Sequence, residues 1–136
     1  MAKAIAETEQ TLLLRTHFGD DAAWKKLCAL VTKKVGEFQA YVTPLSDRQY
    51  DGISVKEIVK LAKRNHAFVL VADEKAITER EHAVLVVDLD DNPGKTFRVV
   101  PRHAWSVENN LSIANMDFIE FLLACGKDGV FRGFPK

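Results

Sequence analysis

The chain has 136 residues, of which 47% are hydrophobic and 28% charged, as is typical of one soluble globular domain. Nineteen basic and nineteen acidic residues cancel, so the net charge gives no electrostatic reason to expect nucleic acid or an anionic membrane as a partner. The two cysteines, Cys28 and Cys125, lie far apart, which disfavours a disulfide framework and favours a reducing compartment. Because no apolar leader or membrane-length segment is present, we expect a cytoplasmic protein.

The domain organisation predicted from the sequence is simple. Residues 1–10 contain neither an apolar run nor a turn motif and are predicted to form a flexible lead-in. Residues 11–136 contain no repeat, low-complexity tract or linker, and we therefore expect them to form a single globular domain.

The first elements of this domain follow from apolar patterns. The run 11–18 indicates a buried strand. Apolar positions at helical spacing then predict a helix that begins after a cap at Asp20 or Asp21 and extends to about Val35. A second strand is expected around 38–43 and stops before the following proline.

The next helix has the most complete set of boundary residues in the chain. Ser54 and Glu57 have the spacing of a capping box, and Ile53 and Ile58 occupy the positions of a hydrophobic staple. Asn65 can end this helix in the left-handed conformation.

The second half of the chain is predicted to contain mainly strands. The apolar runs 67–72 and 84–89 indicate central strands, and the polar segment 73–82 between them is expected to form a loop or an irregular turn. The turn-rich segment 90–95 then joins the second of these strands to a partner strand at 96–100, which makes a hairpin.

A long polar loop is predicted from Trp105 to Asp117. It is followed by a short helix that opens with a cap formed by Asp117 and Glu120 and ends near Cys125. The resulting order is β-α-β-α-β-β-β-α. This order predicts a single α/β domain, bordering on α+β, in which helices pack on a mixed sheet.

The polar loop is the strongest candidate for a binding site. It combines a large amphipathic ring with amides and a carboxylate that can bind a ligand or a partner's backbone. The residues concerned are Trp105, Glu108, Asn109, Asn110 and Asn115. The alternative is that these side chains satisfy the loop's own backbone groups and that the tryptophan lies in the core.

Carboxylates at predicted strand ends suggest a second kind of site. Asp73, Asp88 and Asp90 could hold a divalent metal for phosphoryl transfer or hydrolysis if their strands end at the same edge of the sheet. If the strand 84–89 runs antiparallel to its neighbour, Asp88 lies at the opposite edge from Asp73. Neither the histidines nor the cysteines have the spacing of a metal site, so no metal or cofactor is predicted.

The motif WSVENNLSIANMDFIEF, with VLVVDLDDNPGKTFRVVP before it and DGVFRGF after it, resembles an uncharacterised, mainly bacterial family known only as a domain of unknown function. The resemblance extends from Leu12 to Phe134 and implies no activity. The segment Asn115 to Phe121 is also similar to the end of intracellular immunity and partner-binding domains of polymorphic toxin systems.

The sequence contains no catalytic constellation, so we expect a small cytoplasmic binding module that acts by protein–protein contact and has an immunity-like role. Its expected partner is a protein of unknown identity rather than nucleic acid or a membrane, and homodimer formation is left open. The alternative is the metal-dependent enzyme described above.

Overall fold

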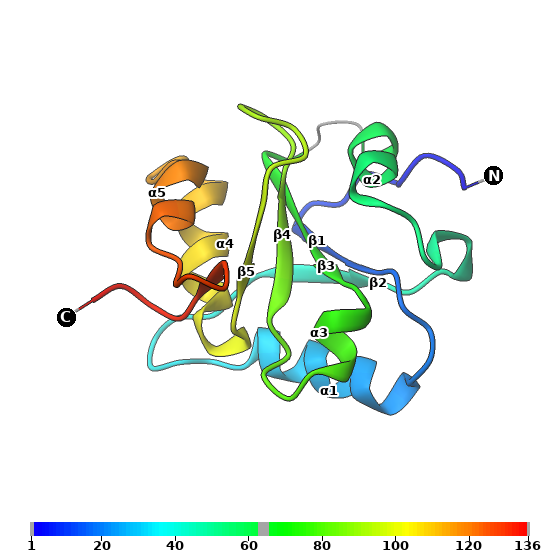
Figure 1. Ribbon diagram of the computed structural model, residues 1–136, viewed down its shortest axis with the longest axis horizontal. Coiled ribbons are helices and arrows are strands. Elements are labelled where there is room, and N and C mark those ends of the chain that lie inside the picture. Colours follow the sequence, from blue (N-terminus) through cyan, green and yellow to red (C-terminus); the bar gives the residue numbers. More distant parts are fainter. Residues whose placement is uncertain (1, 63–65, 136) are drawn as a thin grey trace.

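The computed structural model describes residues 2–62 and 66–135. Its centre is a six-stranded mixed sheet in the order β2-β1-β3-β4-β5-β6 (Figure 1). The strands are β1 (Thr11–Arg15), β2 (Val42–Leu45), β3 (Phe68–Ala72), β4 (Val84–Asp88), β5 (Thr96–Val99) and β6 (Val130–Phe131). The α-helices are α1 (Asp21–Thr32), α2 (Val55–Leu61), α3 (Glu74–Thr78), α4 (Ala104–Ser112) and α5 (Phe118–Leu123). Short 3-10 turns occupy Arg48–Tyr50 and Pro101–His103.

The direction of the strands divides the sheet into two halves. Strand β1 runs parallel to both β2 and β3, so α1 and α2 are crossovers between parallel strands. Strand β4 is antiparallel to β3 and to β5, and β6 then pairs parallel to β5. The predicted α/β class and mixed sheet are confirmed, with α3, α4 and β6 as elements that the predicted order lacks.

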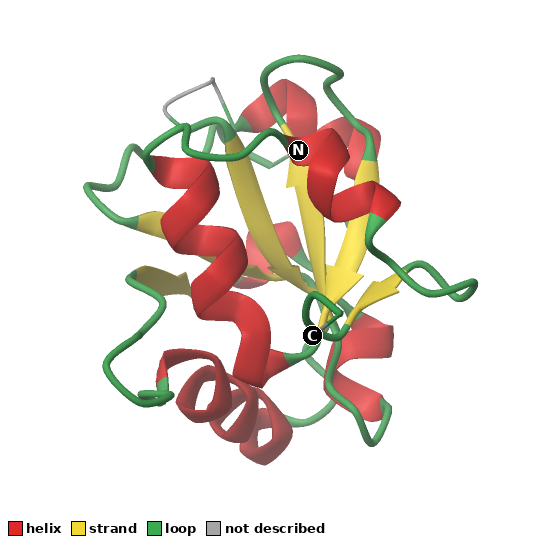
Figure 2. Ribbon diagram, turned by 90° about the vertical axis from the view of Figure 1, so that its left-hand side faces the viewer, coloured by secondary structure: helices red, strands yellow, loops and turns green. Residues whose placement is uncertain are grey.

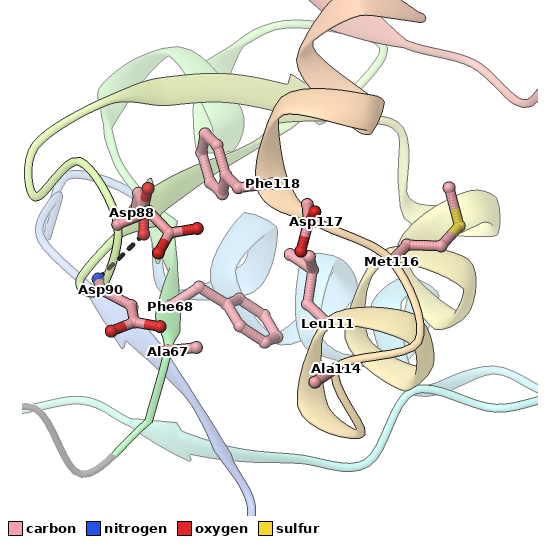
Figure 3. Close-up of a pocket in the computed structure, with 10 residues that line it drawn as sticks. Ala67, Phe68, Asp88, Asp90, Leu111, Ala114, Met116, Asp117 and Phe118 are labelled. Atoms are coloured by element: carbon pink, nitrogen blue, oxygen red, sulfur yellow. Dashed lines mark hydrogen bonds between the residues drawn. The ribbon is translucent and has the colours of Figure 1, made fainter.

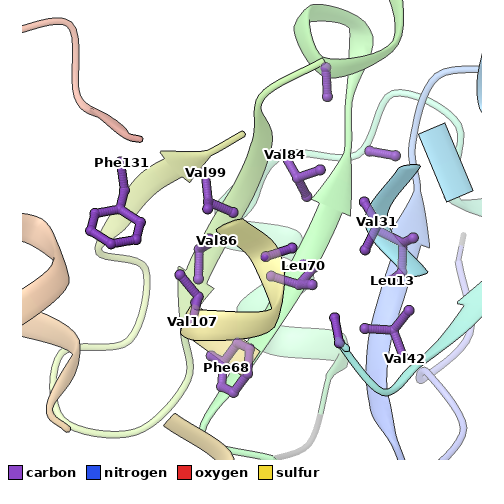
Figure 4. Packing of buried hydrophobic residues seen from close by; sticks show 14 of the residues in the cluster. Leu13, Val31, Val42, Phe68, Leu70, Val84, Val86, Val99, Val107 and Phe131 are labelled. Atoms are coloured by element: carbon purple, nitrogen blue, oxygen red, sulfur yellow. The ribbon is translucent and has the colours of Figure 1, made fainter. Parts of the chain in front are cut away.

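Helices cover both faces of the sheet, because successive side chains of a strand point to opposite sides. Leu13 of β1 belongs to the larger cluster, which includes side chains from α1, α3, α4 and α5, whereas Leu12 and Leu14 belong to the cluster beneath α2. Figures 1 and 2 show the helices arranged around the sheet. Figure 4 shows Val31 of α1 and Val107 of α4 packing with the strand residues of the larger cluster.

The segment before β1 packs across α2. Ile5 is buried, and its backbone N–H donates to the carbonyl of Leu61 at 2.9 Å. The hydroxyl of Tyr50 donates to the carbonyl of Lys3, also at 2.9 Å. Residues 2–10 therefore cover one end of the smaller cluster without forming a helix or strand of their own.

Several boundaries in the first half differ from the prediction. Strand β1 ends at Arg15 rather than at residue 18. Helix α1 ends at Thr32 rather than near Val35, because the backbone becomes extended at Lys33. Strand β2 begins at Val42 and contains Pro44, although the strand was predicted around 38–43 and to stop before this proline. The proline is accommodated because β2 is an edge strand with a neighbour on one side only.

The capping box predicted for α2 is confirmed. The Ser54 hydroxyl accepts from the Glu57 backbone N–H, and the Glu57 carboxylate accepts from the Ser54 backbone N–H, both at 3.1 Å. The predicted left-handed end at Asn65 lies outside the described residues.

Two segments predicted as loops contain helices. Segment 73–82 includes α3, whose first turn is capped by the Asp73 carboxylate, which accepts from the Ala76 backbone N–H at 3.1 Å. The prediction of a loop from Trp105 to Asp117 was wrong for its first half, since α4 occupies Ala104–Ser112. Helix α5 begins at Phe118, as predicted, but ends at Leu123, and the Asp117 side chain makes no capping hydrogen bond.

The C-terminal tail returns to the body of its own chain. Phe134 packs against Phe121 and Phe131, with ring centroids 5.5 and 4.9 Å apart. Arg132 binds Glu81 and Asp128 at 2.6 and 2.7 Å, which attaches the tail to the segment between α3 and β4. None of the helices in the described part of the chain has the length and apolarity needed to span a bilayer.

Candidate functional site

Residues 33–41 connect α1 to β2 and cross α4; we call this segment the strap. It contains a tight turn in which Val35 and Phe38 exchange backbone hydrogen bonds of 2.8 and 3.1 Å. Gly36 adopts a φ of +62° in this turn, a conformation that glycine takes without steric cost. The turn brings the side chain of Phe38 onto α4.

An aromatic pair joins the strap to α4. The rings of Phe38 and Trp105 stack with centroids 4.3 Å apart and planes inclined by 12°. Trp105 packs against the larger core cluster, whereas Phe38 remains 50% exposed. The indole Nε1 of Trp105 is buried and has no hydrogen-bond partner among the described residues. The pair therefore extends the core outward to the surface.

Glu108 lies beneath the strap and is buried, with only 5% of its surface exposed. Its Oε1 accepts from the backbone N–H of Tyr41 at 2.6 Å and from the Asn109 amide at 3.1 Å. Its Oε2 accepts from the Ser112 hydroxyl at 2.6 Å. A buried carboxylate is costly unless donors surround it, and here three donors do so.

Asn109 continues this network towards α1. Its amide donates to the carbonyl of Gln39 at 3.0 Å, and the Gln39 amide in turn donates to the carbonyl of Thr32 at 2.7 Å. Thr32 is the last residue of α1, so its carbonyl lacks a helical partner. The strap is thus held between the end of α1 and the side of α4.

Asn110 and Asn115 serve a different part of the molecule, the connection between α4 and α5. The Asn110 amide donates to the carbonyl of Ser106, and the Asn115 amide donates to Asn110 Oδ1, both at 2.8 Å. Ala114, between them, has a φ of +55°. The structure therefore places the five predicted site residues on α4 and its following turn, and the four polar side chains bond within the chain.

Several exposed apolar side chains lie on the strap and at the end of α4, and they were not among the site residues predicted from the sequence. We define the strap patch as these residues together with Trp105: Val35, Phe38, Tyr41 and Ile113, with exposed fractions of 38, 50, 55 and 74%. From the sequence, residues 33–35 were predicted to end the preceding helix, and residues 38–43 to form a strand. Gly36 and the polar residues around Phe38 were the features that could have indicated a surface turn instead.

The strand-end carboxylates do not form one site. Asp73 follows β3 and binds Arg98 through two hydrogen bonds of 2.6 and 3.0 Å. Asp88 pairs with Phe68, the first residue of β3, because β4 runs antiparallel to it. Asp73 and Asp88 therefore lie at opposite ends of the sheet.

Asp88 and Asp90 instead line a small pocket of about 80 Å³ with Asp91 and Asp117 (Figure 3). The two carboxylate oxygens of Asp88 accept from the backbone N–H groups of Asp90 and Asn92, at 2.9 and 3.0 Å. This carboxylate thereby holds the turn between β4 and β5. Residues 2–62 and 66–135 contain no group of three or more His, Cys, Asp or Glu side chains arranged to hold a metal ion.

The two cysteines are free thiols that are not activated by their surroundings. Burial raises the pKa of Cys28 to about 11. Burial, followed by the negative charge of Asp128, raises the pKa of Cys125. Since the thiolate is the nucleophilic form, neither position favours covalent chemistry near neutral pH.

The fold and the strap patch define the class of molecule: a single-domain mixed α/β protein with an aromatic surface supported by buried polar groups. The chain belongs to the family described as Domain of unknown function (DUF6924), whose model matches residues 10–134. No curated protein matches the chain.

Proposed function

We propose that the protein is a small cytoplasmic binding module that acts by protein–protein contact through the strap patch. The observation that carries this proposal is the stacked pair of Phe38 and Trp105. Phe38 is half exposed to solvent, and Trp105 packs against the core. Aromatic side chains are enriched at the centres of protein interfaces because they bury a large apolar area.

The support beneath the patch strengthens the proposal. The hydrogen bonds of Glu108 and Asn109 fix the strap backbone before a partner arrives. A prearranged surface loses less conformational entropy on binding than a mobile loop does. In this proposal Trp105, Glu108 and Asn109 position the strap, whereas Asn110 and Asn115 shape the end of α4 beside Ile113. An immunity-like role, in which the module covers the surface of a partner protein, is one form of this function.

The test is a comparison of baits in the lysate of the native host, with each bait first matched for melting temperature. The strap variant carries Phe38→Ser and Tyr41→Ser, and the matched control carries Leu123→Ser on α5, where the native side chain is 79% exposed. We expect a protein that the native bait and the control both capture to be lost by the strap variant. Equal capture by all three baits would contradict the proposal, as would equal loss in the strap variant and the control.

A further inference from the structure

A second pocket lies at the end of α1 opposite to the strap. It has a volume of about 400 Å³ and sits where β1 and β2 end, between the first turns of α1 and the segment that follows β2. Strands β2, β1 and β3 are parallel neighbours, so their carboxyl ends meet at this edge of the sheet. In open α/β sheets, ligands bind outside the carboxyl ends of parallel strands.

The last residue of β1, Arg15, lines this pocket although only 3% of its surface is exposed. Its Nε donates to the carbonyl of His17 at 2.8 Å, and its two terminal nitrogens donate to Ser46 Oγ at 3.3 Å and Asp21 Oδ1 at 2.8 Å. A guanidinium carries five N–H donors, so these three bonds leave two donors for another acceptor.

The charge of Arg15 is only partly compensated. Within the described residues its ion-pair partner is Asp21, whose side chain is 71% exposed to water. Burying a cation costs free energy unless an anion and further acceptors accompany it. A buried arginine that faces a pocket is therefore suited to receive an anionic ligand.

Two further cations border the same pocket. Lys25 and Arg48 line it together with Asp21, the single carboxylate among the described residues of the lining. The hydrogen bond and charge of Arg15 hold the pKa of Asp21 below its usual value, and the charges of Arg48 and Lys25 lower that pKa further. One carboxylate thus faces three cations, and the pocket has an excess of positive charge.

Aromatic rings lie against the guanidinium groups of the two arginines. The guanidinium carbon of Arg15 lies 4.3 Å from the centroid of the Phe18 ring and 5.5 Å from that of Trp24. The guanidinium carbon of Arg48 lies 5.3 Å from the same Phe18 ring. Phe18 thereby keeps both arginines near the pocket and offers an apolar wall beside the charged groups.

We propose that this pocket binds a phosphate group, either free or carried by a small organic molecule. The planar guanidinium groups of Arg15 and Arg48 can each donate two parallel hydrogen bonds to phosphate oxygens, and Lys25 adds a mobile positive charge. The volume lies within the range of small-molecule sites, so an organic part can occupy the space beside Phe18 and Trp24. This function is separate from the proposed protein contact, because the length of α1 lies between the two surfaces.

The test uses Trp24 as the reporter in a chain carrying Trp105→Phe, which leaves it as the single tryptophan. Inorganic phosphate and phenyl phosphate are titrated at constant ionic strength, and Trp24 fluorescence is recorded. We expect a saturable change. Tighter binding of phenyl phosphate would support an organic phosphate as the ligand, and equal affinities would support free phosphate. The absence of a saturable change with both probes would overturn the proposal.

Charge variants then separate this pocket from general electrostatic attraction. Arg48→Gln with Lys25→Gln should raise the dissociation constant by about tenfold or more, because two charged donors are removed. The matched control, Lys56→Gln with Lys60→Gln on α2, removes the same net charge elsewhere and should leave the constant nearly unchanged. Equal effects of the two variants would overturn the proposal. Arg15→Lys keeps the positive charge but loses the planar guanidinium, and should weaken phosphate binding if the variant remains folded. The variant with Arg48→Gln and Lys25→Gln changes exposed residues only, so its result does not depend on whether Arg15→Lys folds.

Discussion

Asn109 and Asn115 are the same residue type in the same motif, but their surroundings differ. Asn109 bonds to the strap backbone beneath a half-buried surface, whereas Asn115 is exposed and bonds to another side chain. Asn109→Ala should therefore lower the free energy of unfolding by about 1 to 2 kcal/mol, because the carbonyl of Gln39 loses its donor. Asn115→Ala should change it by less than about 0.5 kcal/mol.

Urea unfolding of both variants measures this difference, with the native chain as the reference. Equal losses of stability in the two variants would contradict the expectation that Asn109 contributes more to stability than Asn115. If only Asn109→Ala lowers the free energy of unfolding, its capture of a partner has to be compared with that of the native chain at equal folded fraction.

The thiol of Cys28 gives a prediction about pH. Because burial raises its pKa from the ordinary 9.0 to about 11, the folded chain contains far less thiolate near neutral pH than the unfolded chain does. Alkylation of Cys28 by iodoacetamide should be at least about tenfold slower in the folded chain, since higher intrinsic nucleophilicity offsets only part of the lost thiolate. The rate should rise as the pH approaches 11. Mass spectrometry of quenched samples measures it, and equal rates in folded and urea-unfolded protein would contradict the expectation.

Among the elements, α2 and α4 show what local sequence can predict. The boundary of α2 depends on Ser54 and Glu57, which bond to each other's backbone and therefore form a pattern visible within four residues. Helix α4 has no side-chain cap at His103 and consists largely of residues with modest helix propensity. It is helical because Val107 and Leu111 pack on the sheet, and these contacts come from residues distant in the sequence.

The same reasoning explains which parts of the candidate site could be predicted. Polar residues concentrated between Trp105 and Asn115 suggested a site in this region, but they did not indicate that Glu108 would be buried beneath a segment almost 70 residues earlier in the chain. The contribution of Phe38 and Tyr41 depends on where the strap crosses α4, which no local pattern specifies. The parallel half of the sheet was predictable because a single helix separates its successive strands.

The turn of the strap can be tested as an element. Gly36 has a positive φ, and no atom lies within 4 Å of the position that a Cβ would occupy. Gly36→Ala should therefore lower the free energy of unfolding through backbone strain alone, by about 1 kcal/mol. Ala114→Gly, at a φ of +55° in the connection between α4 and α5, should have the opposite sign and raise it by about 0.5 to 1 kcal/mol.

Thermal melts of the two variants provide the measurement. In addition, Gly36→Ala should loosen the stacking of Phe38 on Trp105 and alter tryptophan fluorescence, whereas Ala114→Gly should not. Stabilisation of the chain by Gly36→Ala would contradict the turn geometry described for the strap.

At the scale of the whole molecule, exposed carboxylates link stability to acid. The hydrogen bond from Arg132 holds the pKa of Glu81 and of Asp128 below the ordinary values of 4.5 and 3.8. In the unfolded chain these groups bind protons first as the pH falls, so protonation favours unfolding. The ion pairs therefore stabilise the folded chain fully at a pH above the ordinary pKa values of 4.5 and 3.8. This stabilisation is lost as the pH falls from those values, which apply to the unfolded chain, to the lower pKa values of the folded chain.

The urea midpoint should therefore be nearly constant above pH 5 and should fall below about pH 4.5. Arg132→Gln should reduce this dependence on pH, because it removes the cation that both carboxylates share. A midpoint that stays constant into stronger acid would contradict the assigned ion pairs.

The two borders of the sheet restrict how this protein can meet others. Strand β2, at one border, contains Pro44, which has no N–H to donate, and β6, at the other, consists of Val130 and Phe131 alone. An incoming peptide that extends a sheet needs a long row of free backbone donors and acceptors, and neither border offers one. Recognition by backbone pairing is therefore disfavoured, and a partner has to be selected by the shape and chemistry of side chains. The same property protects the chain from joining into fibres when it is concentrated.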